Sequence, residues 1–526
     1  MKGISNQVVE ETKYLDKKIE ELAVISQSKS ERNDSLEKIS NEGDLLAKFD
    51  IPEDLKDNLT EEDIEFLNIK VIPQPWYKWF SPTDTAKEKR LVLKLDLLIL
   101  VYLFLSSFVK TLDSSAVSYA YVSGMKEDLG MYGNELTYQS SCYMAGFIVG
   151  QIPLTMLATI IPVNYYLPAM DIVWALFTLF IFKIENYRQL YALRFCIGLL
   201  SSFFFPTVQF ILGSWYKKSE IVIRSAIYFV ASQAGSMATG YIQTAAYSHL
   251  SGKAGLKGWQ WLYVLAFIIA VPISAYGFFT IPGLPEKINR KSLLTDDELK
   301  LARLRMIREG RRTNDKLTIS VIRKTLKGWR FWILVVFAIF FSQADGISSN
   351  NGLPLWLKAS NYSVSKINTI TTVIPAVTIF FSLLNGIVVD SWEDSHPFVI
   401  SYVAVLNLIA GILLVIWNIS KGGIMLAFFL SGTADSIAAV LYSWANLICS
   451  ENSQERALTL STMNTLGNTF SVWVPLFVWK TVDAPEYKKG YGYNIALDAT
   501  MLILLVPLTY LYKKSQKKEK PNENEL

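Results

Sequence analysis

Histidine is scarce in this chain of 526 residues. The two histidines, His249 and His396, both fall in expected loops. Two histidines are too few for most histidine-based catalytic or metal centres, and we expect neither a metal nor another cofactor. The phosphate-binding P-loop pattern is also missing, which argues against an ATP-driven pump. These absences disfavour an enzyme, including a membrane acyltransferase, which would also have many spans.

Cysteines and charged residues are few as well. Cys142, Cys196 and Cys449 each lie in an apolar run, so they are expected to be small core residues rather than a disulfide framework. The first residues are charged and lack a continuous apolar core, which argues against a signal peptide. Charged residues make up only 19% of the chain, hydrophobic residues make up 51%, and the net charge is +4. This composition is typical of an integral membrane protein rather than of a nucleic-acid-binding protein.

Twelve apolar runs are each long enough to cross a bilayer, which takes about 20 helical residues. They lie near 93–112, 136–160, 166–183, 190–212, 222–246, 260–281, 329–349, 367–389, 398–417, 423–446, 457–480 and 491–512. The pattern predicts an all-α polytopic membrane protein with twelve transmembrane helices in two six-helix halves. Gly146 and Gly150 in the second run allow a neighbouring helix to approach closely.

A hydrophilic segment separates the two groups of six runs. It carries 13 Lys/Arg against six Asp/Glu, which places it in the cytoplasm, and an even number of spans then places both termini there. Within it, Thr295 and Glu298 form a capping pattern that predicts a helix. The polar tail up to about residue 75 is expected to fold weakly or not at all. The expected domains are an amino-terminal tail (1–90), a first half (91–281), a linker (282–328), a second half (329–512) and a carboxy-terminal tail (513–526).

Two charged residues, Lys110 and Asp113, end the first apolar run, LVLKLDLLILVYLFLSSFVKTLDSS. A charge near the bilayer centre costs at least about 2.5–3.5 kcal/mol, so it usually faces a cavity, a partner charge or a substrate. Lys110 and Asp113 are therefore candidates for such a site. The alternative is that both lie at the membrane boundary, where a lysine side chain reaches water.

Other acidic residues interrupt later runs. Asp345 lies in the polar break SQADGISSN, and small residues around Asp435 leave room for a cavity. We assign both to the substrate site, with Trp444 as an aromatic wall, although ordinary packing is the alternative for the tryptophan. Asp171 in the third run is a candidate for proton coupling. Asp498 in the twelfth run is expected near a loop end.

The two groups of runs also carry related segments. SWYKKSEIVIRSAI follows the fourth run and SWANLICSENSQERALTL follows the tenth, and each combines Ser-Trp with a downstream acid and base. These pairs are Glu220 with Arg224 and Glu455 with Arg456. Twelve spans in two halves with a long middle loop resemble the layout of the major facilitator superfamily. Gly386 and Asp390, at the end of the eighth run, resemble that superfamily's loop motif, so the resemblance implies a role in conformational change for these residues.

Arg194 lies in the segment LRFCIG of the fourth run. This segment resembles the superfamily's fourth-span arginine motif, which is linked there to proton coupling. A structural partnership with a buried acid such as Asp171 is an equal alternative for Arg194.

Three further segments narrow the resemblance. AYVSGMKEDLGMYGNEL, GSWYKKSEIVIRSAIYF and SWANLICSENSQERALTLSTMN resemble fungal permeases of the allantoate permease group, an anion:cation symporter branch. The similarity is to permeases for pantothenate, for biotin and for ethionine-sulfoxide resistance. Pantothenate permeases carry an arginine directly after the first-span aspartate, where this chain has Ser114. Lys110 would then supply the positive charge.

The resemblance implies proton-coupled uptake of a small organic anion such as pantothenate by a monomer in a fungal plasma membrane. Alternative substrates are biotin, allantoate or another ureide, and sulfur-containing amino-acid derivatives. A transport-derived nutrient sensor, whose tail would bind a partner, is a further alternative. The expected partners are the anion, the proton and the lipid bilayer, and no nucleic acid.

Overall fold

The computed structural model describes residues 51, 53–56, 59–69, 78–285, 293–308, 319–392, 394–449 and 453–519. Within these ranges the chain is helical and contains no strand. The chain divides into two compact units. The smaller unit takes in Met1–Ile72 and Lys300–Asn314, and the larger unit takes in Pro73–Leu299 and Asp315–Leu526.

The smaller unit contains α2 (Glu53–Lys56), α3 (Glu61–Asn68) and most of α13 (Asp296–Arg308). Phe66 and Leu304 belong to its apolar cluster, and Lys300 of α13 donates a hydrogen bond of 2.5 Å to Asp63 of α3. The helix expected in the linker is confirmed. The expectation that the tail folds weakly or not at all is wrong for α2 and α3, because their apolar residues find partners more than 200 residues away on α13.

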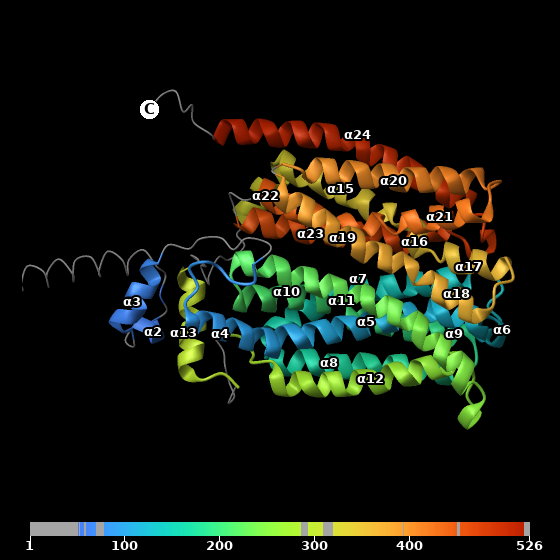
Figure 1. Ribbon diagram of the computed structural model, residues 1–526, viewed down its shortest axis with the longest axis horizontal. Coiled ribbons are helices and arrows are strands. Elements are labelled where there is room, and N and C mark those ends of the chain that lie inside the picture. Colours follow the sequence, from blue (N-terminus) through green and yellow to red (C-terminus); the bar gives the residue numbers. More distant parts are fainter. Residues whose placement is uncertain are drawn as a thin grey trace, which may run out of the picture. The chain divides into compact units, whose positions relative to one another are not determined.

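Two groups of helices make up most of the larger unit (Figure 1). The first half, as we use the term below, comprises α4 (Ala86–Leu95), α5 (Val101–Ala120), α6 (Lys126–Leu129), α7 (Glu135–Ile160), α8 (Val163–Phe180), α9 (Tyr187–Ser201), α10 (Phe204–Trp215), α11 (Lys218–Ala245) and α12 (Gly258–Thr280). The second half comprises α15 (Trp329–Ala344), α16 (Gly346–Ser349), α17 (Gly352–Ala359), α18 (Val364–Thr371), α19 (Val373–Ser391), α20 (His396–Ile416), α21 (Lys421–Ser431), α22 (Ala438–Ile448), α23 (Ser453–Val478) and α24 (Lys488–Glu519). A short helix, α14 (Ile319–Lys327), precedes α15.

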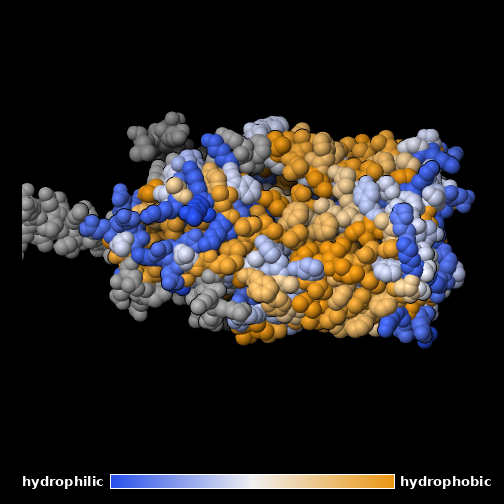
Figure 2. Space-filling view, turned by 60° about the horizontal axis from the view of Figure 1, so that its bottom comes forward, coloured by the Kyte–Doolittle hydropathy of each residue, from blue (hydrophilic) through white to orange (hydrophobic). Residues whose placement is uncertain are grey.

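In the described part of the chain, nine helices or continuous helix series are long and apolar enough to cross a membrane. Every apolar run expected from the sequence lies on a helix, but α11 and α23 are not among the nine, and α15 has only 16 residues. The number twelve therefore stays a prediction. Figure 2 shows a broad apolar surface over the middle of the helices, as a lipid-facing surface requires.

The polar helices α11 and α23 lie between the halves. In Figure 1, α7 and α11 of the first half face α19 and α23 of the second, and α7 packs on α23 while α11 packs on α19. A helix that faces protein on several sides can carry polar residues, because they do not meet lipid. Thr239 and Gln243 of α11 are fully buried in this way.

Hydrogen bonds join the two halves at the end away from the linker. Asn368 donates to Ser123 at 3.2 Å, Thr137 donates to the carbonyl of Trp479 at 3.0 Å, and Lys358 pairs with Glu127 at 2.7 Å. Residues 123, 127 and 137 lie at or just after the far end of the first helix series, Ala86–Leu129. The halves are therefore closed against each other at this end.

Helices α7 and α9 approach each other through glycines. A Cβ atom at Gly146 would lie 2.1 Å from the carbonyl oxygen of Phe195, and one at Gly198 would lie 2.0 Å from that of Tyr143. The close approach expected at Gly146 and Gly150 is confirmed, since a Cβ at Gly150 would lie 2.5 Å from the carbonyl oxygen of Leu199.

We expect Gly146→Ala to lower the thermal unfolding temperature, because the new methyl group collides with backbone that cannot move without separating α7 from α9. Gly386→Ala is the matched control, since a Cβ there meets nothing within 4 Å. Alanine is favoured over glycine in a helix by about 0.5–1 kcal/mol, so the control should be neutral or slightly stabilising. Fluorescence-monitored unfolding in detergent measures both, and equal effects of the two changes would contradict the packing described here.

Candidate functional site

Lys110 lies in the first half, on the face of α5 that looks toward α9 and α10. Its Nζ donates a hydrogen bond of 3.0 Å to the carbonyl oxygen of Ser201 and lies 4.8 Å from the centre of the Phe204 ring. Ser201 is the last residue of α9, where the chain breaks before α10. Carbonyls at a helix end lack helical donors, and a lysine can satisfy them. The ammonium group is half-buried, and its hydrogen-bond partner is neutral.

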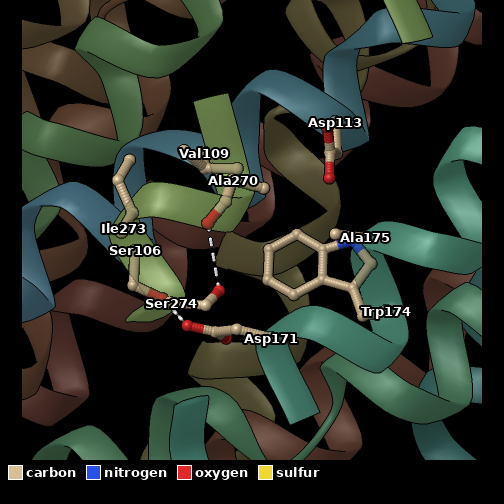
Figure 3. Close-up of a pocket in the computed structure, with 9 residues that line it drawn as sticks. All are labelled: Ser106, Val109, Asp113, Asp171, Trp174, Ala175, Ala270, Ile273 and Ser274. Carbon is tan, nitrogen blue, oxygen red and sulfur yellow. Dashed lines mark hydrogen bonds between the residues drawn. The ribbon is translucent and has the colours of Figure 1, made fainter. Parts of the chain in front are cut away.

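Asp113 faces a different region from Lys110. Three residues turn an α-helix by about 300°, so the two side chains leave α5 about 60° apart. Figure 3 shows Asp113 beside a small pocket between α5, α8 and α12. The carboxylate is 3% exposed, and neither oxygen has a hydrogen-bond partner. The donors near it, Trp174 Nε1 and Thr178 Oγ1, are also unsatisfied.

Asp171 of α8 lies against the same pocket (Figure 3). One of its carboxylate oxygens accepts hydrogen bonds of 2.6 Å from the hydroxyl groups of Tyr102 and Ser106, while the other has no partner. The free space of the pocket is that of about one water molecule. Two buried carboxylates, one of them without a hydrogen bond, therefore share a small polar space inside the first half.

Both Lys110 and Asp113 lie near the middle of the continuous helix series Ala86–Leu129. This position favours a place within the membrane over the membrane boundary that was the alternative, and the depth of both residues stays a prediction. The apolar run 93–112 underestimates this helix, because small and hydroxyl-bearing residues after Asp113 lower the hydropathy without ending the helix.

Arg194 does not pair with Asp171. Its Nε donates 2.9 Å to Gln139 of α7, and its guanidinium lies 4.6 Å from the centre of the Tyr143 ring. The side chain is 4% exposed, and its charge interacts with that of Asp113. Of the two alternatives for Arg194, the structural partnership with Asp171 is not observed.

In the second half, Asp345 and Asp435 occupy two breaks in helices. Asp345 separates α15 from α16 and accepts a hydrogen bond from the Ser348 hydroxyl, as the polar break in its sequence predicts. Asp435 lies in a single 3₁₀ turn between α21 and α22 and is exposed. The two carboxylates are near enough to repel each other electrostatically.

A hydrogen bond across the halves ends at Asp435. Gln233 of α11 donates 2.9 Å to this carboxylate. Gln233 lies on the same helix as Ser232, which bonds to Thr111, the neighbour of Lys110. The structure therefore brings Asp345 and Asp435 together and links Asp435 to α11, which also bonds to α5 through Thr111. Lys110 itself points toward Ser201 and Phe204, and the acid whose charge interacts with it is Asp171.

Two further residues lie away from this group. Trp444 is buried, with its ring stacked on His396 and edge-on to Tyr512. This position corresponds to the ordinary packing considered above. Asp498 is buried and accepts hydrogen bonds from Asn407 and Asn494, so the expectation that it lies near a loop end is wrong.

A buried ion pair connects the start of the first helix series to α11. Arg224 donates from Nε and Nη2 to the two oxygens of Asp96, at 2.7 and 2.8 Å. Trp79 also donates to Asp96, and its ring lies beneath the guanidinium. Removal of one partner of such a pair costs about 3–5 kcal/mol, because the other charge stays buried.

A second charged group adjoins this ion pair. Lys217 Nζ donates to Asp84 at 2.6 Å and to Glu88 at 2.9 Å, and all three side chains are buried. Glu220 accepts a hydrogen bond from the backbone of Lys217 and so caps α11. Glu220 and Arg224 thus belong to one charged network at the linker end of the first half.

Comparison with known proteins agrees with this architecture. Residues 103–475 match the family model described as Major Facilitator Superfamily. The chain belongs to the major facilitator superfamily. It is 35% identical to the pantothenate transporter liz1 of Schizosaccharomyces pombe, over 78% of this chain and 80% of that protein. Identity is 32% to the pantothenate transporter FEN2 of Saccharomyces cerevisiae, over 78% and 81%, and 31% to the vitamin H transporter of that yeast, over 84% and 76%.

Solved structures of superfamily members share the fold. A crystal structure of a D-xylose-proton symporter superposes with a TM-score of 0.57 at 12% identity, over 78% of this chain and 96% of that one. A bacterial homologue of the human lysosomal transporter Spinster gives the same TM-score at 14% identity, over 81% and 98%. The protein is therefore a multi-pass secondary transporter with the superfamily fold, and the predicted resemblance to pantothenate and biotin permeases is confirmed.

The superfamily motif residues of the second half lie on two helices. Gly386 and Asp390 are on the last turns of α19, and the side chain of Asp390 lies outside what the structure describes. Glu455 and Arg456 are in the first turn of α23. Their roles in conformational change stay predictions.

Sequence reasoning missed four of the six residues in the charged network of the first half, namely Asp84, Glu88, Asp96 and Lys217. Asp96 interrupts the run LVLKLDLLIL, so the rule that selected Asp345 as an acid within an apolar run would have found it. Asp84 and Glu88 precede the run, and Lys217 follows the fourth run. They gave no such signal because charged residues are ordinary at membrane boundaries.

Proposed function

We propose that this transporter carries pantothenate, or a closely related monocarboxylate vitamin, into a fungal cell together with protons. The observation that carries the proposal is the similarity to two pantothenate transporters over most of both chains. We place the protein in the plasma membrane as a monomer, with the linker and both termini in the cytoplasm, as the charge distribution predicts.

Lys110 is the residue that would attract the anion. No carboxylate of the described residues lies within ion-pair distance of its Nζ, which bonds to a neutral carbonyl. A partly buried cation whose interacting acid, Asp171, is not bonded to it is incompletely compensated. A substrate carboxylate would supply a nearer counter-charge with strong, charge-assisted hydrogen bonds. The role is consistent with Ser114, which stands where the related permeases have an arginine.

Asp345 and Asp435 would complete the substrate site and give it a proton dependence. Two neighbouring carboxylates repel each other and an incoming anion, and binding of a proton by either one relieves both repulsions. Asp113 and Asp171, with Arg194 nearby, are the second proton-binding group that we propose, since no donor is within hydrogen-bond geometry of the Asp113 carboxylate, although Trp174 and Thr178 lie near it.

Transport would proceed by rocking of the halves around this site. The bonds between the halves at the end away from the linker would open when the opposite end closes. The bond from Gln233 to Asp435 lies at mid-depth, where a substrate would compete for the same carboxylate. Carrying one net positive charge inward adds about 2.3 kcal/mol per 100 mV, or roughly fiftyfold accumulation.

Biotin is the second candidate substrate, because the vitamin H transporter of Saccharomyces cerevisiae is 31% identical to this chain.

Uptake of labelled pantothenate in a yeast strain lacking its own pantothenate permease tests the proposal. We expect saturable uptake that unlabelled pantothenate abolishes and that biotin, allantoate and ethionine sulfoxide leave largely unchanged. Uptake of labelled biotin instead would contradict the choice of substrate and leave the carboxylate mechanism standing.

In the same strain, we expect Lys110→Ala to abolish pantothenate uptake while the protein still reaches the plasma membrane. The reason is that an anion entering a low-dielectric site needs a compensating charge. Lys183→Ala is the control, since Lys183 is exposed at the end of the third helix series. Near-normal uptake by a correctly located Lys110→Ala protein would remove Lys110 from the substrate site.

For Asp345→Asn, we expect exchange of pantothenate down its gradient to survive while accumulation driven by a pH gradient is lost. Asparagine keeps the size of aspartate but cannot take up a proton. Counterflow and pH-driven uptake measured in the same proteoliposomes separate the two activities, with Asp394→Asn at an exposed position as control. Retained proton-driven accumulation would move the coupling role to Asp113, Asp171 or Asp435.

A further inference from the structure

A groove lies on the surface of the second half, between the first turns of α20 and the last turns of α24. These two helices run side by side at the edge of the second half (Figure 1). Pro397 and Ser401 form one wall, and Leu502, Val506 and Tyr510 lie along the other. The spacing of four residues places these three side chains on one stripe of α24. The groove is therefore apolar along its length.

Two lysines, Lys513 and Lys514, line the end of this groove nearest the carboxy terminus. Both are exposed, and Lys514 Nζ lies 6.0 Å from the centre of the Tyr510 ring. The side chains of Val506 and Tyr510 are 70% and 64% exposed. An open apolar channel thus leads to a pair of positive charges.

The length of the groove matches one leaflet of a bilayer. Leu502 and Lys513 are separated by 11 residues, or about 16 Å along the helix axis, and half of the hydrocarbon core is about 15 Å thick. The apolar stripe then lies at the depth of acyl chains, and the lysines lie at the depth of lipid phosphates. The end of α24 and the beginning of α20 are on the side of the membrane where the linker attaches, since α15 begins directly after the linker.

We propose that this groove binds one anionic phospholipid of the leaflet at the linker side, with an acyl chain along α24 and the phosphate at Lys513 and Lys514. The two positive charges of Lys513 and Lys514 favour an anionic lipid over a neutral one. A neutral sterol could fill the apolar channel, but its single hydroxyl group does not use two positive charges. The lipid would hold α20 against α24 and is independent of the transported substrate.

The test is a lipid titration of the purified full-length protein in detergent, with bound lipid counted by native mass spectrometry. We expect one phosphatidylserine to bind about thirtyfold more tightly than phosphatidylcholine, because each lysine near a lipid surface contributes about 1 kcal/mol. Lys513→Gln combined with Lys514→Gln should abolish this preference. Val506→Trp, which fills the apolar channel, should weaken the binding of both lipids.

Lys488→Gln combined with Lys489→Gln is the matched control, because these residues form the same pair at the other end of α24. This variant should keep the thirtyfold preference. Equal binding of the two phospholipids, or equal loss in both double variants, would overturn the proposal. Displacement of phosphatidylserine by ergosterol would show that the groove binds a sterol. Displacement by soluble glycerophosphoserine would show that the groove binds only the phosphate group. Either result would also overturn the proposal.

Discussion

The cost of holding a charge within an apolar slab governs where this chain places its ionisable residues. The charges of Arg224 and Asp96 compensate each other through two parallel hydrogen bonds. The charge of Lys217 is compensated by ion pairs with two acids, Asp84 and Glu88. These groups join α4 and its flanking residues to the start of α11 at one end of the first half. Lys110 and Asp113 are different, because neither has a counter-charge bonded to it. Incomplete compensation is what a binding site for a charged substrate or a proton requires.

The two halves contact each other at one end of the helices and near their middle. Hydrogen bonds join the halves at the end away from the linker, and the polar helices α11 and α23 face protein at their contact. The bond between Gln233 and Asp435 crosses from one half to the other at mid-depth. A ligand that competes for Asp435 therefore acts on the contact between the halves as well as on the site itself.

Hydropathy located the long helices of the two halves, because lipid-facing surfaces demand long apolar runs, but it missed the short helices α6 and α17. It also identified the helix break at Asp345, since polar residues in the middle of such a run are costly unless they serve a site. The sequence could not show that Lys110 and Asp113 face different helices, because a spacing of three is compatible with one site or two. It likewise could not show that residues near Phe66 fold against α13, since that contact joins segments far apart in the chain. The sequence could indicate that Asp96 has a buried partner, because it is an acid within an apolar run, but it could not show that this partner is Arg224.

The central claim is that a proton accompanies the carboxylate. The most direct measurement is pantothenate uptake into proteoliposomes with the wild-type protein, an imposed pH gradient and the membrane voltage clamped at zero by potassium and valinomycin. The account predicts accumulation above the external concentration when the interior is alkaline, and its loss when a protonophore is added. Accumulation that needs a sodium gradient, or uptake that never exceeds equilibration, would contradict it.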